Sequence, residues 1–196
     1  MKVTNQHGTG LDFMANKVGL SYAHYPEAVG ASCGDFCEHY ESIEWTEIIK
    51  KVLEYHGVEV VIAPVGKLGS KVKWLNEQKV DLAIEVHFNG STNLTVNGCE
   101  TLYCPNSVKG KELADKVHSW LSPSMHNKNR GVKEGWYRMD KTAGIIDYFL
   151  AKTNCPALII EPEFISQIDN ILDRRTVACE SISFGILDYL GVSEWQ

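Results

Sequence analysis

The sequence has no apolar run long enough to cross a membrane, and its first sixteen residues lack the apolar core of a signal peptide. It also has no cluster of Lys and Arg, and its formal net charge is −6. These absences argue against a membrane span and against nucleic acid as the main partner. We therefore expect a protein that is made in the cytoplasm without a recognisable signal peptide.

Internal repeats, low-complexity segments and a dividing linker are also missing from the 196 residues. The composition is 44% hydrophobic and 22% charged, which excludes disordered and fibrous classes. A chain of this length can bury a substantial core as one domain. We expect that domain to span residues 17–196, we leave residues 1–16 unassigned with His7 in solvent, and we favour a monomer.

The tight C-x2-C spacing of strong zinc sites is absent too. Two looser pairs, Cys33-x3-Cys37 and Cys99-x4-Cys104, leave a zinc knuckle as an alternative. The chain is long enough to fold without disulfides, so we expect mostly reduced thiols. The remaining cysteines are Cys155 and Cys179.

What the sequence does contain is an alternation of apolar runs and amphipathic stretches, which favours an α/β domain with a largely parallel sheet and helices on its faces. The expected strands are residues 17–23, 58–63, 80–87, 99–103, 145–151 and 156–160. The expected helices are residues 41–56, 66–78, 109–121 and 172–190, with a long loop over 122–142.

Several ionisable residues stand at the ends of these apolar runs. His24 follows the first strand, His87 ends the third and Glu161 follows the sixth, while Glu38 lies just before the first helix. Parallel strands would bring their carboxyl ends to one edge of the sheet, where ligands bind in open α/β folds. Two histidines and one carboxylate form a catalytic zinc set that leaves a position for water, and a further carboxylate can act as general base and acid.

The motifs also resemble a known family. The resemblance rests on H-x5-G-A at residues 24–31, Glu38 nineteen residues before Gly57, and D-L-A-I-E-V-H-F-N-G at 81–90. Further motifs in the family's order are G-C-E-T-L-Y at 98–103, R-G-V-K at 130–133 and P-A-L-I-I-E-P-E-F-I-S at 156–166. Over about residues 17–190 the chain resembles the zinc-dependent N-acetylmuramoyl-L-alanine amidases of amidase family 3, which includes phage endolysins.

The resemblance implies a single domain with a twisted, mostly parallel six-stranded sheet flanked by helices. It also implies Zn²⁺ held by His24, Glu38 and His87, with Glu161 as the catalytic acid/base. The implied partner is peptidoglycan, and the implied reaction is hydrolysis of the amide between N-acetylmuramic acid and L-alanine. One departure is Ala23, which stands where the family usually has glycine and fits only if its φ is negative.

Neighbouring residues compete for two of these roles. Glu41 is close enough to Glu38 to replace it as a ligand, and His39 is a further alternative. Glu163 competes with Glu161, although Glu161 follows the apolar run directly.

Three other polar residues lie close to these motifs. Asn89 and Arg130 are candidate substrate contacts, each with a structural alternative. Glu85 faces away from Val86 in its strand and is expected to be structural.

The expected biological role is cell-wall lysis by a phage or prophage endolysin, which would reach the wall after release through a holin-made lesion. A bacterial enzyme, a zinc peptidase or other amidohydrolase acting on a different amide, and a non-catalytic wall-binding module are the alternatives.

Overall fold

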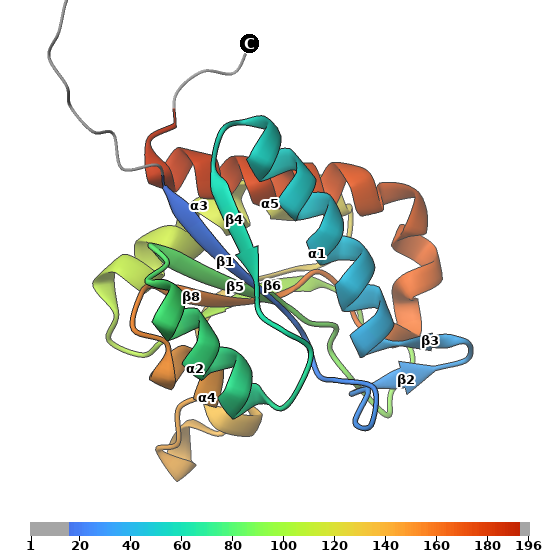
Figure 1. Cartoon of the computed structure of the whole chain (residues 1–196). Helices are drawn as coiled ribbons and strands as arrows, with labels where there is room; N and C mark the ends of the chain where they lie inside the picture. Colours follow the sequence, from blue (N-terminus) through green and yellow to red (C-terminus); the bar gives the residue numbers. More distant parts are fainter. Residues whose placement is uncertain (1–15, 193–196) are drawn as a thin grey trace, which may run out of the picture.

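The computed structural model describes residues 16–192, and the unassigned segment 1–16, with His7, lies outside them except for Asn16. The centre is a six-stranded sheet with helices on both faces (Figure 1). In spatial order its strands are β4 (Glu59–Ile62), β1 (Lys17–Tyr22), β5 (Leu82–Val86), β8 (Ala157–Glu161), β6 (Cys99–Tyr103) and β7 (Asn129–Glu134).

The directions of the strands bring several strand ends to one edge of the sheet. β4, β1, β5 and β8 run parallel to one another, whereas β6 is antiparallel to β8 and parallel to β7. The prediction of an α/β domain with a mostly parallel six-stranded sheet is confirmed. Because β1, β5 and β8 are neighbours, their carboxyl ends meet at one edge, and the amino end of the antiparallel β6 lies at the same edge.

The helices form two layers of unequal size. One face of the sheet is covered by α1 (Glu38–Tyr55), α3 (Val108–Met125) and α5 (Arg175–Leu190), and the other by α2 (Leu68–Gln78) and α4 (Tyr148–Lys152) (Figure 1). The 3₁₀ segments are η1 (Tyr137–Met139), η2 (Lys141–Ala143) and η3 (Ile165–Arg174). Within residues 16–192 no helix combines the length and the apolar character needed to cross a bilayer.

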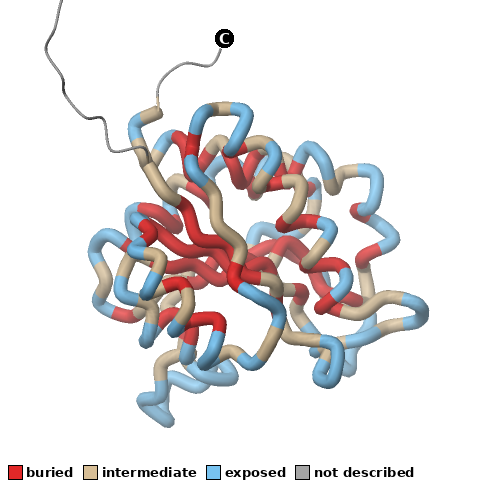
Figure 2. Tube along the Cα trace, in the orientation of Figure 1, coloured by how far each residue is buried: buried red, intermediate tan, exposed pale blue. Residues whose placement is uncertain are grey.

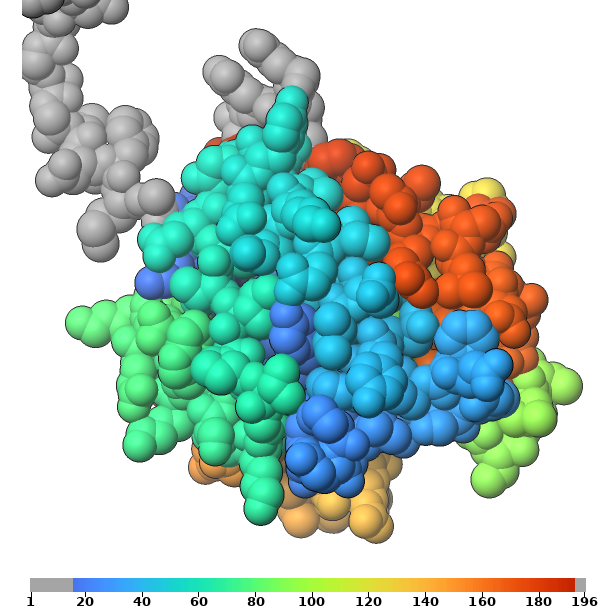
Figure 3. Space-filling view, turned by 45° about the vertical axis from the view of Figure 1, so that its right-hand side comes forward, coloured from blue at the N-terminus to red at the C-terminus, as the bar shows by residue number. Residues whose placement is uncertain are grey.

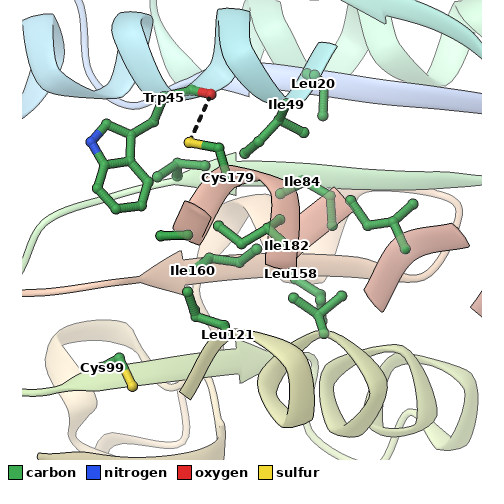
Figure 4. Packing of buried hydrophobic residues seen from close by; sticks show 14 of the residues in the cluster. Leu20, Trp45, Ile49, Ile84, Cys99, Leu121, Leu158, Ile160, Cys179 and Ile182 are labelled. Atoms are coloured by element: carbon green, nitrogen blue, oxygen red, sulfur yellow. Dashed lines mark hydrogen bonds between the residues drawn. The ribbon is translucent and has the colours of Figure 1, made fainter. Parts of the chain in front are cut away.

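The core follows the two-residue period of the strands. In β8, Leu158 and Ile160 pack toward α1, α3 and α5, while Ala157 and Ile159 pack toward α2 and α4. Figure 2 shows that the buried positions gather along the central strands, and Figure 4 shows the larger layer at close range. Each fully buried Leu or Ile side chain contributes about 1.5–3 kcal/mol, so this core fixes the strand ends firmly.

A short hairpin links the first strand to the first helix. β2 (Ser32–Cys33) pairs antiparallel with β3 (Phe36–Cys37), and α1 begins at the next residue, Glu38. In Figure 3 this segment, drawn in blue, lies on the surface beside α1. The hairpin therefore delivers the first residue of α1 to the carboxyl edge of the sheet.

Two local predictions are wrong. Residues 145–151 are not a strand, because Asp147 accepts a hydrogen bond from the Phe149 amide and caps the short helix α4, which buries Phe149 and Leu150. The expected loop 122–142 contains the edge strand β7, whose sequence N-R-G-V-K-E has one apolar side chain and so lacks a strand pattern.

The two ends of the described chain lie close together. The start of β1 and the end of α5 are at the same end of the molecule, opposite the carboxyl edge of β1, β5 and β8 (Figures 1 and 3).

Candidate metal centre

The first histidine of the site leaves the sheet in an unusual backbone conformation. His24 lies two residues beyond β1 and has φ of 58°, in the left-handed region that favours glycine. Ala23 is fully buried and is not among the described residues with positive φ, so alanine in place of the family's glycine causes no strain there. The turn aims the His24 ring at the amino end of α1, where its Nε2 lies 2.9 Å from Glu38 Oε2.

Glu38 is the first residue of α1 and is 5% exposed. Its Oε2 accepts a hydrogen bond from the Ala31 amide at 3.0 Å, and its Oε1 accepts one from the Phe88 amide at 3.2 Å. The amino end of a helix favours a negative side chain. These contacts hold the carboxylate between the hairpin and the end of β5.

His87 follows β5 directly and completes a group of three. Its Nδ1 lies 2.6 Å from Glu38 Oε1, and its ring packs edge-on against His24 with the centroids 5.3 Å apart. One ligand atom from each of His24, Glu38 and His87 lies within 4.8 Å of the others, so the three side chains are a metal-site candidate. All six cysteines are free, and none belongs to this group.

The electrostatics of the group favour a cation. Burial opposes ionisation of Glu38, but the hydrogen bonds from His24 and His87 outweigh it and hold the pKa of Glu38 well below its ordinary value. Burial likewise opposes protonation of His87, yet its contacts with Glu38 and Glu85 raise its pKa. A buried carboxylate that stays charged between two histidines is a favourable environment for a divalent metal ion.

Gly30 fits closely against these ligands. It has φ of +78°, and a Cβ built on it would lie 2.5 Å from His24 Nε2 and closer still to Glu38 Oε2. A side chain there would force His24 or Glu38 to shift, so the absence of a Cβ leaves room for the two ligands to converge.

Glu161 is the last residue of β8 and lies beside this group. Its Oε2 is buried without a hydrogen-bond partner within the described part of the chain. Burial raises the pKa of Glu161 well above its ordinary value; the nearby charge of His87 opposes this rise, and the carboxylates of Glu38, Glu100 and Asp147 add to it.

A cleft of about 180 Å³ opens beside Glu161. Its lining includes His87 and Glu161 at the sheet edge, together with Trp136, Arg138 and Asp147. An unpaired carboxyl group with a raised pKa, placed at a cleft, is typical of a catalytic acid or base.

The chain also matches a known protein family. Residues 18–175 match the family described as N-acetylmuramoyl-L-alanine amidase, which is well over half of the chain. The chain belongs to this family. Its members are hydrolases that act on cell-wall peptidoglycan.

Solved structures share this fold. An N-acetylmuramoyl-L-alanine amidase from Clostridium difficile 630 aligns with a TM-score of 0.80 at 22% identity, covering 92% of this chain and 99% of that one. The catalytic domain of CwlV, an N-acetylmuramoyl-L-alanine amidase from Bacillus (Paenibacillus) polymyxa, aligns with a TM-score of 0.79 at 21% identity, covering 91% of this chain and 99% of that one. The catalytic domain of the CD27L endolysin, which targets Clostridia difficile, aligns with a TM-score of 0.69 at 24% identity, covering 88% of this chain and 97% of that one. At these identities the likeness establishes the fold.

A curated relative from Bacillus anthracis, an uncharacterized cell wall amidase, is 28% identical over 145 residues. The match covers 66% of this chain and 24% of that relative, so the amidase described here spans about a quarter of the relative's length.

The competing residues lie elsewhere in this amidase. Glu41 pairs with Arg175 at 2.8 Å, and His39 Nδ1 lies 2.8 Å from the Ala23 carbonyl, so neither side chain joins the three-ligand group. Glu163 accepts hydrogen bonds from the Gly98 amide at 2.6 Å and the Phe164 amide at 2.8 Å. It also accepts a hydrogen bond from the Asn127 side chain at 2.8 Å, so all of these contacts fix the loops around it.

Both residues expected to contact substrate bind Glu100. Asn89 Nδ2 donates to Glu100 Oε1 at 2.9 Å, and Arg130 Nε donates to Glu100 Oε2 at 2.8 Å. Asn89 also lines the cleft, whereas the Arg130 guanidinium lies 5.0 Å from the Phe164 ring. Their role toward substrate stays a prediction, and the buried Glu100 is a partner that the sequence analysis did not identify.

Glu100 leads to a prediction on acid stability. Burial opposes its ionisation, but hydrogen bonds from Lys133, Arg130 and Asn89 outweigh this and lower its pKa. A lowered folded-state pKa contributes stability above the unfolded pKa of about 4.3, and this is lost as the pH falls through the folded value. We expect Glu100→Gln to cost about 1–3 kcal/mol at pH 7 and progressively less below about pH 4. Urea unfolding of both metal-free proteins across this range measures the difference, and a constant difference down to pH 3 would contradict it.

Proposed function

We propose that this chain hydrolyses the amide bond between N-acetylmuramic acid and L-alanine in peptidoglycan, as a zinc-dependent enzyme. Zinc is held by His24, Glu38 and His87, and Glu161 is the catalytic acid/base. The observation that carries the proposal is the convergence of the three ligand atoms within 4.8 Å of one another, beside a cleft that is lined by His87 and by Glu161 with its unpaired Oε2. Membership of the amidase family supports the reaction.

The donor set suits zinc. Two imidazole nitrogens and one carboxylate are the ligands of many catalytic zinc sites, and with neutral imidazoles they leave the ion with net positive charge. When bound, zinc would supply Lewis-acid chemistry, which polarises the scissile carbonyl and makes a nearby water more acidic. Gly30 supports this assignment because its missing Cβ leaves the ligands free to converge.

Glu161 transfers the proton during the reaction. Burial raises its pKa well above the ordinary value, so the carboxyl group holds a proton more readily than an exposed one and can both accept and deliver it. In the ionised form it takes a proton from the attacking water. In the protonated form it gives that proton to the departing nitrogen of L-alanine, which leaves as an amine.

The cleft orients the substrate between two unlike walls. The sheet edge supplies His87 and Glu161, and the segment that follows β7 supplies Trp136 and Arg138. An aromatic plane suits the apolar face of a sugar ring, and a guanidinium suits the carboxylates of a stem peptide. We propose that the scissile amide lies between these walls, with its carbonyl toward the three ligands.

Mass spectrometry of fragments released from purified peptidoglycan, with and without a zinc chelator, tests the proposal. We expect free stem peptides that begin with L-alanine, abolished by the chelator and restored by zinc. Cuts within the peptide would assign the chain to a peptidase activity instead, and a protein that binds zinc without any cleavage would leave a wall-binding role.

The finer biological role that we propose is phage or prophage endolysis, with release to the wall through a holin-made lesion. The fold likeness to the CD27L endolysin catalytic domain supports it. Expression in a host cell with and without a holin is the test. Lysis that requires the holin is expected, and lysis without it would indicate a different route to the wall.

A further inference from the structure

A buried ion pair lies directly behind the candidate metal centre. Lys71 of α2 and Glu85 of β5 are each 2% exposed, and Lys71 Nζ lies 2.7 Å from Glu85 Oε1. Ser21 donates a second hydrogen bond to the same oxygen at 2.6 Å. Taking two charges out of water is costly, and replacing such pairs with apolar residues is often neutral or stabilising. The pair therefore calls for a role other than stability.

The two oxygens of Glu85 have different partners. Oε1 accepts from Lys71 and Ser21, whereas Oε2 lies 2.9 Å from His87 Nε2. The other ring nitrogen of His87, Nδ1, lies on the side of Glu38 and His24. Since a carboxylate can only accept hydrogen bonds, Glu85 requires the proton of a neutral His87 to sit on Nε2. That tautomer leaves the Nδ1 lone pair free for a metal ion.

We infer that Glu85 is a positioning residue for metal binding, and that Lys71 fixes its orientation by occupying one carboxylate oxygen. Glu85 sets the tautomer and the ring plane of His87, while Lys71 and Ser21 keep Oε2 turned toward the histidine. The inference rests on the proposed metal site and extends it from the three ligands to Glu85 and Lys71.

The chemistry of an amide at position 85 makes the inference testable. Glu85→Gln keeps the shape of the side chain but leaves one acceptor oxygen. Lys71 is donor-only, so the amide oxygen turns to Lys71 and the NH₂ group turns to His87 Nε2. His87 must then accept at Nε2 and carry its proton on Nδ1, which blocks the metal-binding lone pair.

The rescue variant follows from the same argument. Adding Lys71→Met to Glu85→Gln removes the donor that holds the amide oxygen. The amide is then free to turn its oxygen to His87 and its NH₂ group to the Ser21 hydroxyl. The correct tautomer of His87 returns, so the double variant should bind metal more tightly than the single one.

Chelator competition with zinc, and the visible spectrum of the cobalt-substituted protein, measure these effects without an activity assay. We expect Glu85→Gln to weaken zinc binding about 10–100-fold and the double variant to recover at least half of that loss on a logarithmic scale. Glu41→Gln is the matched control, because it breaks the Arg175 ion pair on the same end of α1 without touching His87. It should keep wild-type zinc affinity.

Two results would overturn the inference: unchanged zinc affinity in Glu85→Gln, or a double variant that binds zinc more weakly than the single one, as a purely structural role predicts. The outcome is independent of the proposed reaction. If the zinc affinities of the variants follow this pattern but the wild-type protein cleaves no peptidoglycan, the proposed function is wrong and the inference on Glu85 stands. If the wild-type protein is an active amidase but Glu85→Gln binds zinc as tightly as the wild type, the proposed function stands and the inference is wrong.

Discussion

The Glu161→Gln variant is expected to lose amide hydrolysis by about 10²–10⁴-fold while it keeps its fold and its zinc. Glutamine has the same shape but can neither take a proton from water nor deliver one to the leaving nitrogen. The substitution also leaves an uncharged amide at a buried site where a charge is disfavoured, so unfolding stability should hold or rise. Rates of stem-peptide release, zinc content and urea unfolding together measure these effects.

Glu163→Gln provides the matched control for this experiment. Glu163 lies two residues further on and is buried, but its partners are the Gly98 and Phe164 amides and Asn127. We expect this variant to lose about 1–3 kcal/mol of stability and to keep its hydrolysis rate within a few fold. Full activity in Glu161→Gln, or a large rate loss confined to Glu163→Gln, would transfer the acid/base role away from Glu161.

The second large effect is expected from Gly30→Ala. The new methyl group would overlap His24 Nε2 and Glu38 Oε2, and the backbone there has φ of +78°. Either His24 or Glu38 must move, so the three ligands no longer converge. We expect zinc affinity to fall by at least about 100-fold, with a matching loss of activity, because a metal site tolerates little displacement of its ligands.

Gly34→Ala separates the clash from the backbone strain. Gly34 lies in the turn of the β2–β3 hairpin, four residues after Gly30, and has φ of +57°, but a Cβ there meets no atom within 4 Å. It should cost about 1 kcal/mol of stability without changing zinc affinity. Equal zinc loss in both variants would mean that hairpin strain, and not the contact with the ligands, is responsible.

The edge of the sheet was predictable because its strands are strongly apolar. β5 and β8 lie in the centre and read as mostly apolar runs, β1 beside them has Val18 and Leu20 buried, and an ionisable residue at or just after the end of each strand marks its carboxyl end. His24, His87 and Glu161 could therefore be placed at one edge before any coordinates. Glu38 depended on the family resemblance, since no local pattern distinguishes it from Glu41.

The periphery was harder to predict. β7 is an edge strand that buries little, so its residues carry no strand pattern, and the apolar run 145–151 matches a strand as well as it matches the short helix α4. The partners of Glu85 and Glu100 come from residues far away in the sequence. A charged residue inside an apolar strand does signal a buried partner, but the sequence alone does not say which one.

The position of the two chain ends has a consequence for modular architecture. Both ends of the described chain lie opposite the carboxyl edge of β1, β5 and β8 (Figure 1), and His87 and Glu161 at that edge line the cleft, so a domain joined to either end would be tethered away from the substrate. The Bacillus anthracis relative, of which the matched part is about a quarter, is long enough to use such an arrangement. A wall-targeting domain fused at either end could raise the local concentration of the catalytic unit on its polymer without obstructing it.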